Sequence, residues 1–141
     1  KESAMTAISF VRSKADKFNI KEDFYKEKDI HIHVPEGAVP KDGPSAGITM
    51  TTAIVSALTN RKVNRQFAMT GEVTLRGRVL AIGGLKEKIL AANRYGIKNI
   101  IIPKENEVDI DEIPEEIRET LKIYTVSDVC EVLDLVLEKE V

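Results

Sequence analysis

Hydrophobic residues recur along this chain at three- and four-residue intervals in four segments, a spacing typical of helices. The predicted helices cover residues 4–18, 48–58, 85–95 and 128–137. Gly96 is predicted to close the third of them, and Ser127 to cap the start of the fourth. A surface helix is also predicted to begin near Pro114, after a loop in the acidic stretch 106–119, because a proline ring suits the first helical turn.

Between these segments, short apolar runs and alternation predict strands. Ile30, Ile32 and Val34 alternate with His31 and His33, which predicts a strand with two different faces. Further strands are predicted at residues 67–70, 100–102 and 123–126, with a hairpin formed by residues 73–75 and 79–82. Because strands and helices interleave throughout, the chain is predicted to be a mixed α/β domain with sheets covered by helices.

Length and charge narrow the class of protein. A chain of 141 residues fits one domain, residues 1–141, built around one core. Its 21 Lys and Arg against 23 Asp and Glu give a net charge of −2, so DNA contact is not indicated. No apolar run approaches the roughly 20 residues of a membrane span, and no signal pattern begins the chain. We expect a cytosolic protein without membrane contact, excised from a longer chain because no start Met precedes the first helical pattern.

Cys130 is the only cysteine, which excludes an internal disulfide and a cysteine-rich zinc site. It shares helical spacing with Val126, Val129 and Leu133, and no basic or histidine residue adjoins it in the sequence. We therefore expect a buried, reduced core residue and not a reactive thiol.

A serine stands just before the second predicted helix, in the sequence Pro-Lys-Asp-Gly-Pro-Ser-Ala-Gly at residues 40–47. At a helix start, backbone N–H groups lack partners and the helix dipole favours negative charge. Ser45 therefore stands where a nucleophile and an oxyanion hole can coincide. The alternative is an ordinary capping serine. The letters also match the nucleophile elbow of α/β hydrolases, but they follow a proline-rich loop and not a strand.

Lys88 is the candidate base. At about 100° per residue it falls on the apolar side of its predicted helix with Leu85 and Ala92, whereas Lys86 falls on the other side. An ordinary lysine is neutral in only about one molecule in 2,500 at pH 7, and burial favours the neutral, basic form. The alternative is a lysine whose amine extends to solvent.

The two histidines offer rival chemistry. His31 or His33 with Asp42 could complete a Ser-His-Asp triad, or the pair could bind a metal ion. A further alternative is that both are half-buried and hydrogen-bonded, and shape the site. No Walker A pattern and no Gly-x-Gly-x-x-Gly is present, so we expect no nucleotide site of either type in this chain.

Four segments resemble the proteolytic domain of Lon, the ATP-dependent protease, and the similarity runs nearly end to end. They are His-Ile-His-Val-Pro-Glu-Gly-Ala at 31–38, residues 40–47, Ala-Met-Thr-Gly-Glu-Val-Thr-Leu-Arg-Gly at 68–77 and Ile-Gly-Gly-Leu-Lys-Glu-Lys at 82–88. One departure is Ala81, which stands where proline is expected and leaves the site residues unchanged.

The resemblance implies a serine endopeptidase in which Ser45 is the nucleophile and Lys88 the general base. It also implies that Thr70 hydrogen-bonds and positions the lysine amine, and that Asp42 and Gly43 belong to a loop that can shape or block the site. His33 is expected to support it. The implied fold is the mixed α/β type called ribosomal protein S5 domain 2-like, without metal or cofactor in this domain.

For the longer protein, the resemblance implies an ATPase module that binds ATP and Mg²⁺, a hexameric ring and substrates that are unfolded or damaged proteins, in a bacterial cytoplasm. A competing class is the Lon-like domain of a bacterial recombination ATPase, a DNA-binding and ring-forming scaffold that lacks the dyad. The presence of both Ser45 and Lys88 favours the protease.

Overall fold

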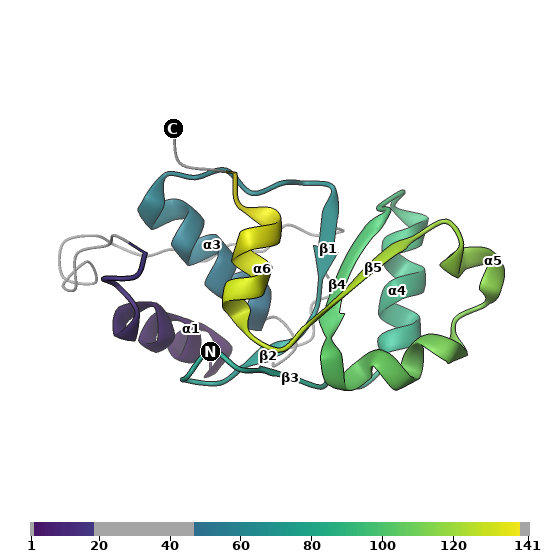
Figure 1. Ribbon diagram of the computed structural model, residues 1–141, viewed down its shortest axis with the longest axis horizontal. Coiled ribbons are helices and arrows are strands. Elements are labelled where there is room, and N and C mark those ends of the chain that lie inside the picture. The colour runs from purple at the N-terminus through teal and green to yellow at the C-terminus, as the bar shows by residue number, and fades with distance from the viewer. Residues whose placement is uncertain (1, 19–46, 139–141) are drawn as a thin grey trace.

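The computed structural model describes residues 2–18 and 47–138, and the labels below are those of Figure 1. The helices are α1 (Glu2–Ser13), α3 (Gly47–Thr59), α4 (Leu85–Arg94), α5 (Glu115–Arg118) and α6 (Val129–Val136), with a 3₁₀ helix, η2 (Lys104–Glu112). The strands are β1 (Phe67–Met69), β2 (Glu72–Val73), β3 (Val79–Leu80), β4 (Asn99–Pro103) and β5 (Lys122–Val126). This interleaving confirms the mixed α/β class.

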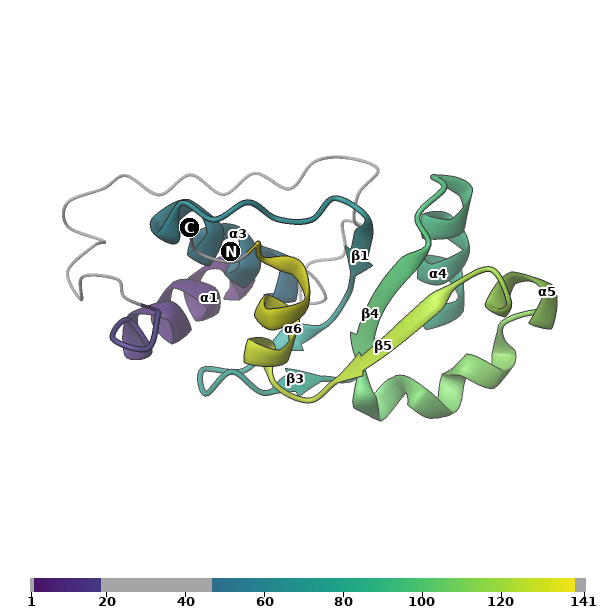
Figure 2. The ribbon, with the colours of Figure 1, turned by 45° about the horizontal axis from the view of Figure 1, so that its top comes forward.

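Within the described residues, three strands form a parallel sheet in the order β1-β4-β5. Met69 lies beside Ile101, which lies beside Tyr124, and the preceding row runs from Ala68 through Ile100. Successive side chains of a strand point to opposite faces, so the two rows face different layers. Figures 1 and 2 show these layers: α1, α3 and α6 gather on one side of the sheet, and α4 covers the other.

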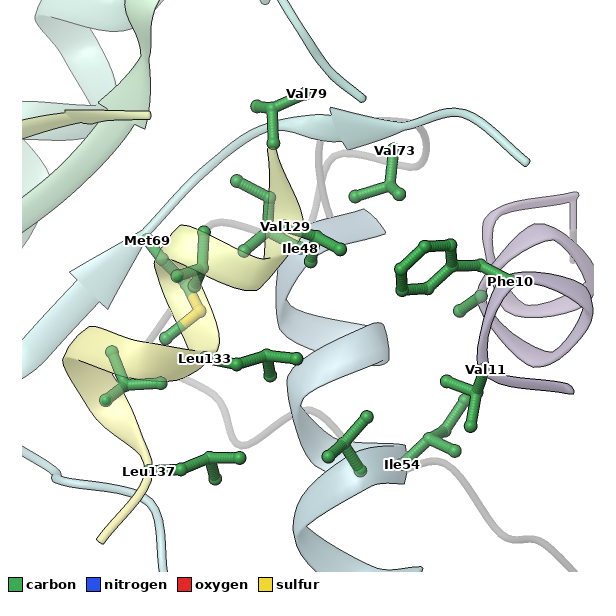
Figure 3. Packing of buried hydrophobic residues seen from close by; sticks show 14 of the residues in the cluster. Phe10, Val11, Ile48, Ile54, Met69, Val73, Val79, Val129, Leu133 and Leu137 are labelled. Carbon is green, nitrogen blue, oxygen red and sulfur yellow. The ribbon is translucent and has the colours of Figure 1, made fainter. Parts of the chain in front are cut away.

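The larger core lies on the side of α1, α3 and α6. Phe10 and Val11 of α1 point toward Ile48 and Ile54 of α3, and Leu133 of α6 enters the same cluster (Figure 3). Ile48 and Val11 are fully buried. Burying a side chain of this size stabilises the fold by about 1.5–3 kcal/mol relative to leaving it in water, so these helices are held on the sheet chiefly by apolar contact.

The second core lies beneath α4. It joins the sheet row that contains Ala68 and Ile100 to α4 and to the end of η2. Its buried members are Ala68, Leu85, Ile89, Ala92, Ile100, Ile102 and Ile113. The sheet is therefore buried on both faces, as expected of a parallel sheet. The sequence predicted one core, whereas the sheet divides the apolar residues into two clusters.

The predicted hairpin is confirmed as the antiparallel pair β2-β3. At its turn, Gly77 has a φ of 90°, and a Cβ there would lie 2.4 Å from an edge carbon of Phe10. The Gly77 carbonyl also accepts a hydrogen bond from the Val129 amide at 2.8 Å. The turn is thus held between α1 and the start of α6.

Several predicted boundaries change. The first helix ends at Ser13, before Phe18, and the loop expected after Pro103 is the 3₁₀ helix η2. The start of α6 is capped by Asp128 and not by Ser127: the Asp128 carboxylate accepts from the Cys130 amide at 2.8 Å, and Glu131 reaches back to the Asp128 amide at 3.1 Å. This reciprocal pair is a capping box, which a carboxylate can form at this position.

The remaining boundaries follow the expected signals. Gly96 closes α4 with a φ of 78°, and its amide donates to the Asn93 carbonyl while the Ile97 amide donates to that of Ala92. These two bonds define a Schellman cap. The predicted strand at residues 30–34 lies outside the described residues. No helix in the described ranges is long and apolar enough to cross a membrane.

Candidate active site

Lys88 lies on the face of α4 that packs on the sheet. The buried residues of this helix are Leu85, Lys88, Ile89 and Ala92, which follow the three- and four-residue spacing of one helical face. Only 9% of the Lys88 surface is exposed, whereas Lys86 is exposed to solvent. The prediction that Lys88, and not Lys86, faces the interior is confirmed, and its role in catalysis stays a prediction.

The chain enters α4 through two glycines. Gly84 is the N-cap with a φ of 70°, a left-handed conformation that glycine adopts without a Cβ penalty. No side chain caps this end, and the Gly84 carbonyl accepts the Lys88 amide at 3.2 Å. The position of Lys88 along the sheet therefore depends on how the residues before Gly84 are fixed.

Thr70 follows β1 and continues its pairing, because its amide donates to the Ile101 carbonyl at 3.1 Å. Alternation along this extended backbone places Thr70 on the same face as Ala68, the face covered by α4. The residue is 4% exposed, and its Oγ1 is buried without a hydrogen bond in the described structure. The predicted hydrogen bond from Thr70 to the lysine amine is therefore not formed here.

A buried hydroxyl without a partner costs about 1–3 kcal/mol. Such a group in a native structure needs an explanation, and a catalytic role is one such explanation. The Thr70 hydroxyl is thus a buried polar group without a hydrogen bond, on the same side of the sheet as Lys88.

The start of α3 is attached to the end of β1. The Ile48 amide donates to the Gly71 carbonyl at 3.0 Å. Gly47 packs closely on the backbone that follows Gly71: a Cβ at Gly47 would lie 2.7 Å from the Val73 nitrogen and 3.3 Å from the Glu72 Cα. Only glycine permits this approach, so the helix start that follows Ser45 is fixed against the β1 end. One first-turn amide, that of Ile48, is already used and cannot serve an oxyanion.

Four residues expected at the site, Ser45, Asp42, Gly43 and His33, lie outside the described residues, as does His31. Their roles stay predictions, and so do the triad and the metal pair built on the histidines. Within residues 2–18 and 47–138, no group of three or more His, Cys, Asp or Glu side chains could hold a metal ion. The described part of the site therefore consists of Lys88, Thr70 and the start of α3.

Cys130 differs from its prediction. It is half-buried, and the Lys17 ammonium donates to its Sγ at 3.4 Å. Sequence adjacency could not reveal this neighbour, because Lys17 reaches it from the segment after α1. Burial raises the pKa of the Cys130 thiol, and the Lys17 hydrogen bond opposes that shift. Cys130 is therefore not the fully buried core residue that was expected, and its low reactivity stays a prediction.

Sequence reasoning missed Asn106. It is 2% exposed in η2, and its side-chain amide hydrogen-bonds both the N–H and the C=O of Ile82, each at 2.9 Å. Ile82 stands two residues before the N-cap of α4. An asparagine within an acidic stretch has no periodic signal that separates it from a surface residue, so only the structure reveals its burial.

Comparison with known proteins identifies the family. The profile described as the Lon protease (S16) C-terminal proteolytic domain matches residues 1–139. The chain is 67% identical over 137 residues to a Lon protease of Finegoldia magna, and the aligned residues cover 97% of this chain and 18% of that protein. Over 139 residues it is 62% identical to a Lon protease of Clostridioides difficile, covering 99% of this chain and 18% of that protein.

Lon protease 1 of Bacillus subtilis is 63% identical over 134 residues, which cover 95% of this chain and 17% of that protein. The chain thus spans less than a fifth of the length of the curated relatives it matches. The family match extends over the segments that contain Ser45, Thr70 and Lys88. The chain therefore belongs to the family of Lon protease C-terminal proteolytic domains.

Proposed function

We propose that this chain is a serine peptidase domain that cleaves peptide bonds through a dyad of Ser45 and Lys88. The observation that carries the proposal is the burial of Lys88 on the sheet-facing side of α4, which holds this lysine inside the fold while Lys86 of the same helix lies in solvent. Only Ala46 separates Ser45 from Gly47, the first residue of α3, in the sequence.

The reaction follows the acyl-transfer pattern of activated serines. The Ser45 Oγ forms a bond to the peptide carbonyl carbon while the neutral Lys88 amine accepts the hydroxyl proton. The resulting ammonium then donates that proton to the leaving amine as the C–N bond breaks. In the second half, Lys88 accepts a proton from water, the hydroxide attacks the ester, and Ser45 leaves as a hydroxyl that regains the proton.

An oxyanion forms in both halves and needs N–H donors. The dipole at the start of α3 favours negative charge there. Because the Ile48 amide is bonded to Gly71, we assign the oxyanion to the other first-turn amides and to those of the segment that contains Ser45. Thr70 supplies a hydroxyl for the lysine amine during turnover. The loop of Asp42 and Gly43 controls access to the site, and His33 is a further supporting residue of the site.

Covalent labelling tests the dyad. The chain is incubated with a fluorophosphonate probe, and the labelled fraction is followed by intact-mass spectrometry. We expect no labelling in Ser45→Ala and a loss of at least about a hundredfold in Lys88→Met, the range of general-base contributions. Lys86→Met is the matched control, because Lys86 lies on the same helix and is exposed. Its labelling should equal that of the parent chain.

Three results would contradict the proposal. Labelling of Lys88→Met at the parent rate would exclude Lys88 as the base, and a loss confined to His31→Ala or His33→Ala would restore the triad. Binding of duplex DNA without any labelling would favour the scaffold class.

The longer protein is part of the proposal as well. We propose for it an ATP-dependent protease in which a separate module binds ATP and Mg²⁺, and in which this domain joins a hexamer that degrades unfolded or damaged proteins; what supports this is the similarity to Lon proteases more than five times as long as this chain. The bacterial sources of these relatives support a bacterial cytoplasm. The S5 domain 2-like fold type is likewise part of the proposal and rests on the family match.

A further inference from the structure

Asn106 joins the start of η2 to the segment that leads into α4. Its Oδ1 accepts the Ile82 amide and its Nδ2 donates to the Ile82 carbonyl, both at 2.9 Å. The side chain thus pairs with Ile82 as a neighbouring strand would, but through one residue. The same Nδ2 donates a second bond to the Asp109 carboxylate at 2.9 Å, which fixes which end of the amide faces which group.

Within the described residues, this clamp lies just before the start of α4, an end that no side chain caps. Gly83 is exposed and a Cβ there would meet no atom within 4 Å, and Gly84 has no side-chain cap bonded to it. The two glycines therefore offer little resistance to a shift of the helix start. Ile82, held by Asn106, is the nearest fixed point before the first turn, which contains Lys88.

The apolar contacts of α4 cannot replace the clamp. Leu85, Ile89 and Ala92 hold the helix on the sheet, but the hydrophobic effect that drives this burial is not directional. Two hydrogen bonds to one backbone residue allow a single register. General-base catalysis needs that register, because a misplacement of about 1 Å can lower a rate by about a hundredfold.

We propose that Asn106 is a positioning residue that sets the place of the Lys88 amine by clamping the backbone of Ile82. The inference rests on the proposed Ser45–Lys88 dyad. Asn106 touches neither the substrate nor the reacting atoms in this scheme, and it acts only through the entry to α4.

Asn106→Asp is the sharpest substitution, since it keeps the shape and replaces the Nδ2 donor by an oxygen. That oxygen would face the Ile82 carbonyl and the Asp109 carboxylate, both of which accept hydrogen bonds. Labelling by the fluorophosphonate probe is measured over a range of probe concentrations, which separates the rate constant of the covalent step from the affinity of the encounter. We expect the rate constant to fall about tenfold or more and the affinity to change less than about twofold.

A double-mutant cycle with Lys88→Met distinguishes positioning from general damage. If Asn106 acts through Lys88, Asn106→Asp causes no further loss once Lys88 is methionine. An equal loss in both backgrounds, or a parent rate in Asn106→Asp alone, would overturn the positioning role. A parent rate in Lys88→Met alone would instead overturn the dyad, so the two failures are distinct.

A second variant covers the case in which Asn106→Asp does not fold. Asp109→Ala removes only the group that orients the amide, at a half-buried position, and we expect a smaller fall of about three- to fivefold in the same rate constant. Leu133→Ala, in the core on the opposite side of the sheet, serves as the destabilised control and should label at the parent rate at a temperature where it is folded. An Asp109→Ala rate equal to that of the parent contradicts the inference.

Discussion

Replacing Gly47 by alanine should shift the start of α3 while lowering the stability of the fold only modestly. A Cβ at this position would lie 2.7 Å from the Val73 nitrogen, and Cβ atoms essentially never approach closer than 3.0 Å. The obstacle is backbone, so no side-chain rotation relieves it. The helix start or the β2 segment must move by at least about 0.3 Å, and by about 0.7 Å to reach ordinary contact.

The stability cost is modest because two effects oppose each other. Overpacking of this kind costs about 1–3 kcal/mol. Alanine is favoured over glycine in a helix by up to about 1 kcal/mol, which offsets part of that cost. We therefore expect Gly47→Ala to unfold in urea with a free energy about 1–2 kcal/mol below that of the parent chain, and to remain folded at 25 °C.

The effect on reactivity is larger. Ser45, the proposed nucleophile, precedes Gly47 by two residues, and we expect a shift of about half an ångström at the helix start to lower the rate of its labelling about tenfold. Fluorophosphonate labelling followed by intact mass measures it. Gly96→Ala is the control: its left-handed φ of 78° costs about 1 kcal/mol without any collision. If Gly47→Ala labels within about twofold of the parent, or if both variants slow equally, the reasoning fails.

Two further predictions concern α6 and its cysteine. Asp128→Ala should lower the free energy of unfolding in urea by about 0.5–2 kcal/mol through loss of the capping box, whereas Ser127→Ala should change it by less than about 0.5 kcal/mol; the reverse order would restore the cap predicted from sequence. Burial raises the pKa of the Cys130 thiol above its ordinary value, so less thiolate is present at pH 8 than in the unfolded chain. Alkylation by iodoacetamide should therefore be slower in the folded chain than in the unfolded chain. The ratio of the two rates should fall as the pH rises through the thiol pKa, because both thiols then ionise. A ratio independent of pH would contradict the prediction.

The sequence predicted the elements well where one periodicity dominated. The face of α4 that contains Lys88 followed from residue spacing alone, because a ten-residue helix on a sheet must bury one side. The Gly96 cap followed from glycine's tolerance of a left-handed backbone. These signals depend only on neighbouring residues, so they can be recognised in the sequence without knowledge of the tertiary contacts.

Contacts between distant segments were not predictable in this way. Asn106 meets Ile82 across 24 positions, and Lys17 meets Cys130 across 113, and neither pair has a spacing that identifies it. Asp128 was overlooked as a cap because Ser127, beside it, is an equally good capping residue in isolation. The roles of Ser45 and Lys88 came from family resemblance and residue chemistry, since a serine before a helix and a lysine on an apolar face each have ordinary structural explanations.

The shared core of α1 and α6 has a consequence for synthesis of the protein on the ribosome. Phe10 and Val11 belong to the same cluster as Val129 and Leu133, so the core draws on residues made near the start and near the end of this chain. At typical elongation rates, on the order of ten seconds separate the appearance of the two helices. The α1–α3 pair can form first, but the apolar surface reserved for α6 stays exposed to solvent throughout that interval. We expect this apolar surface to be most prone to aggregation just before α6 emerges.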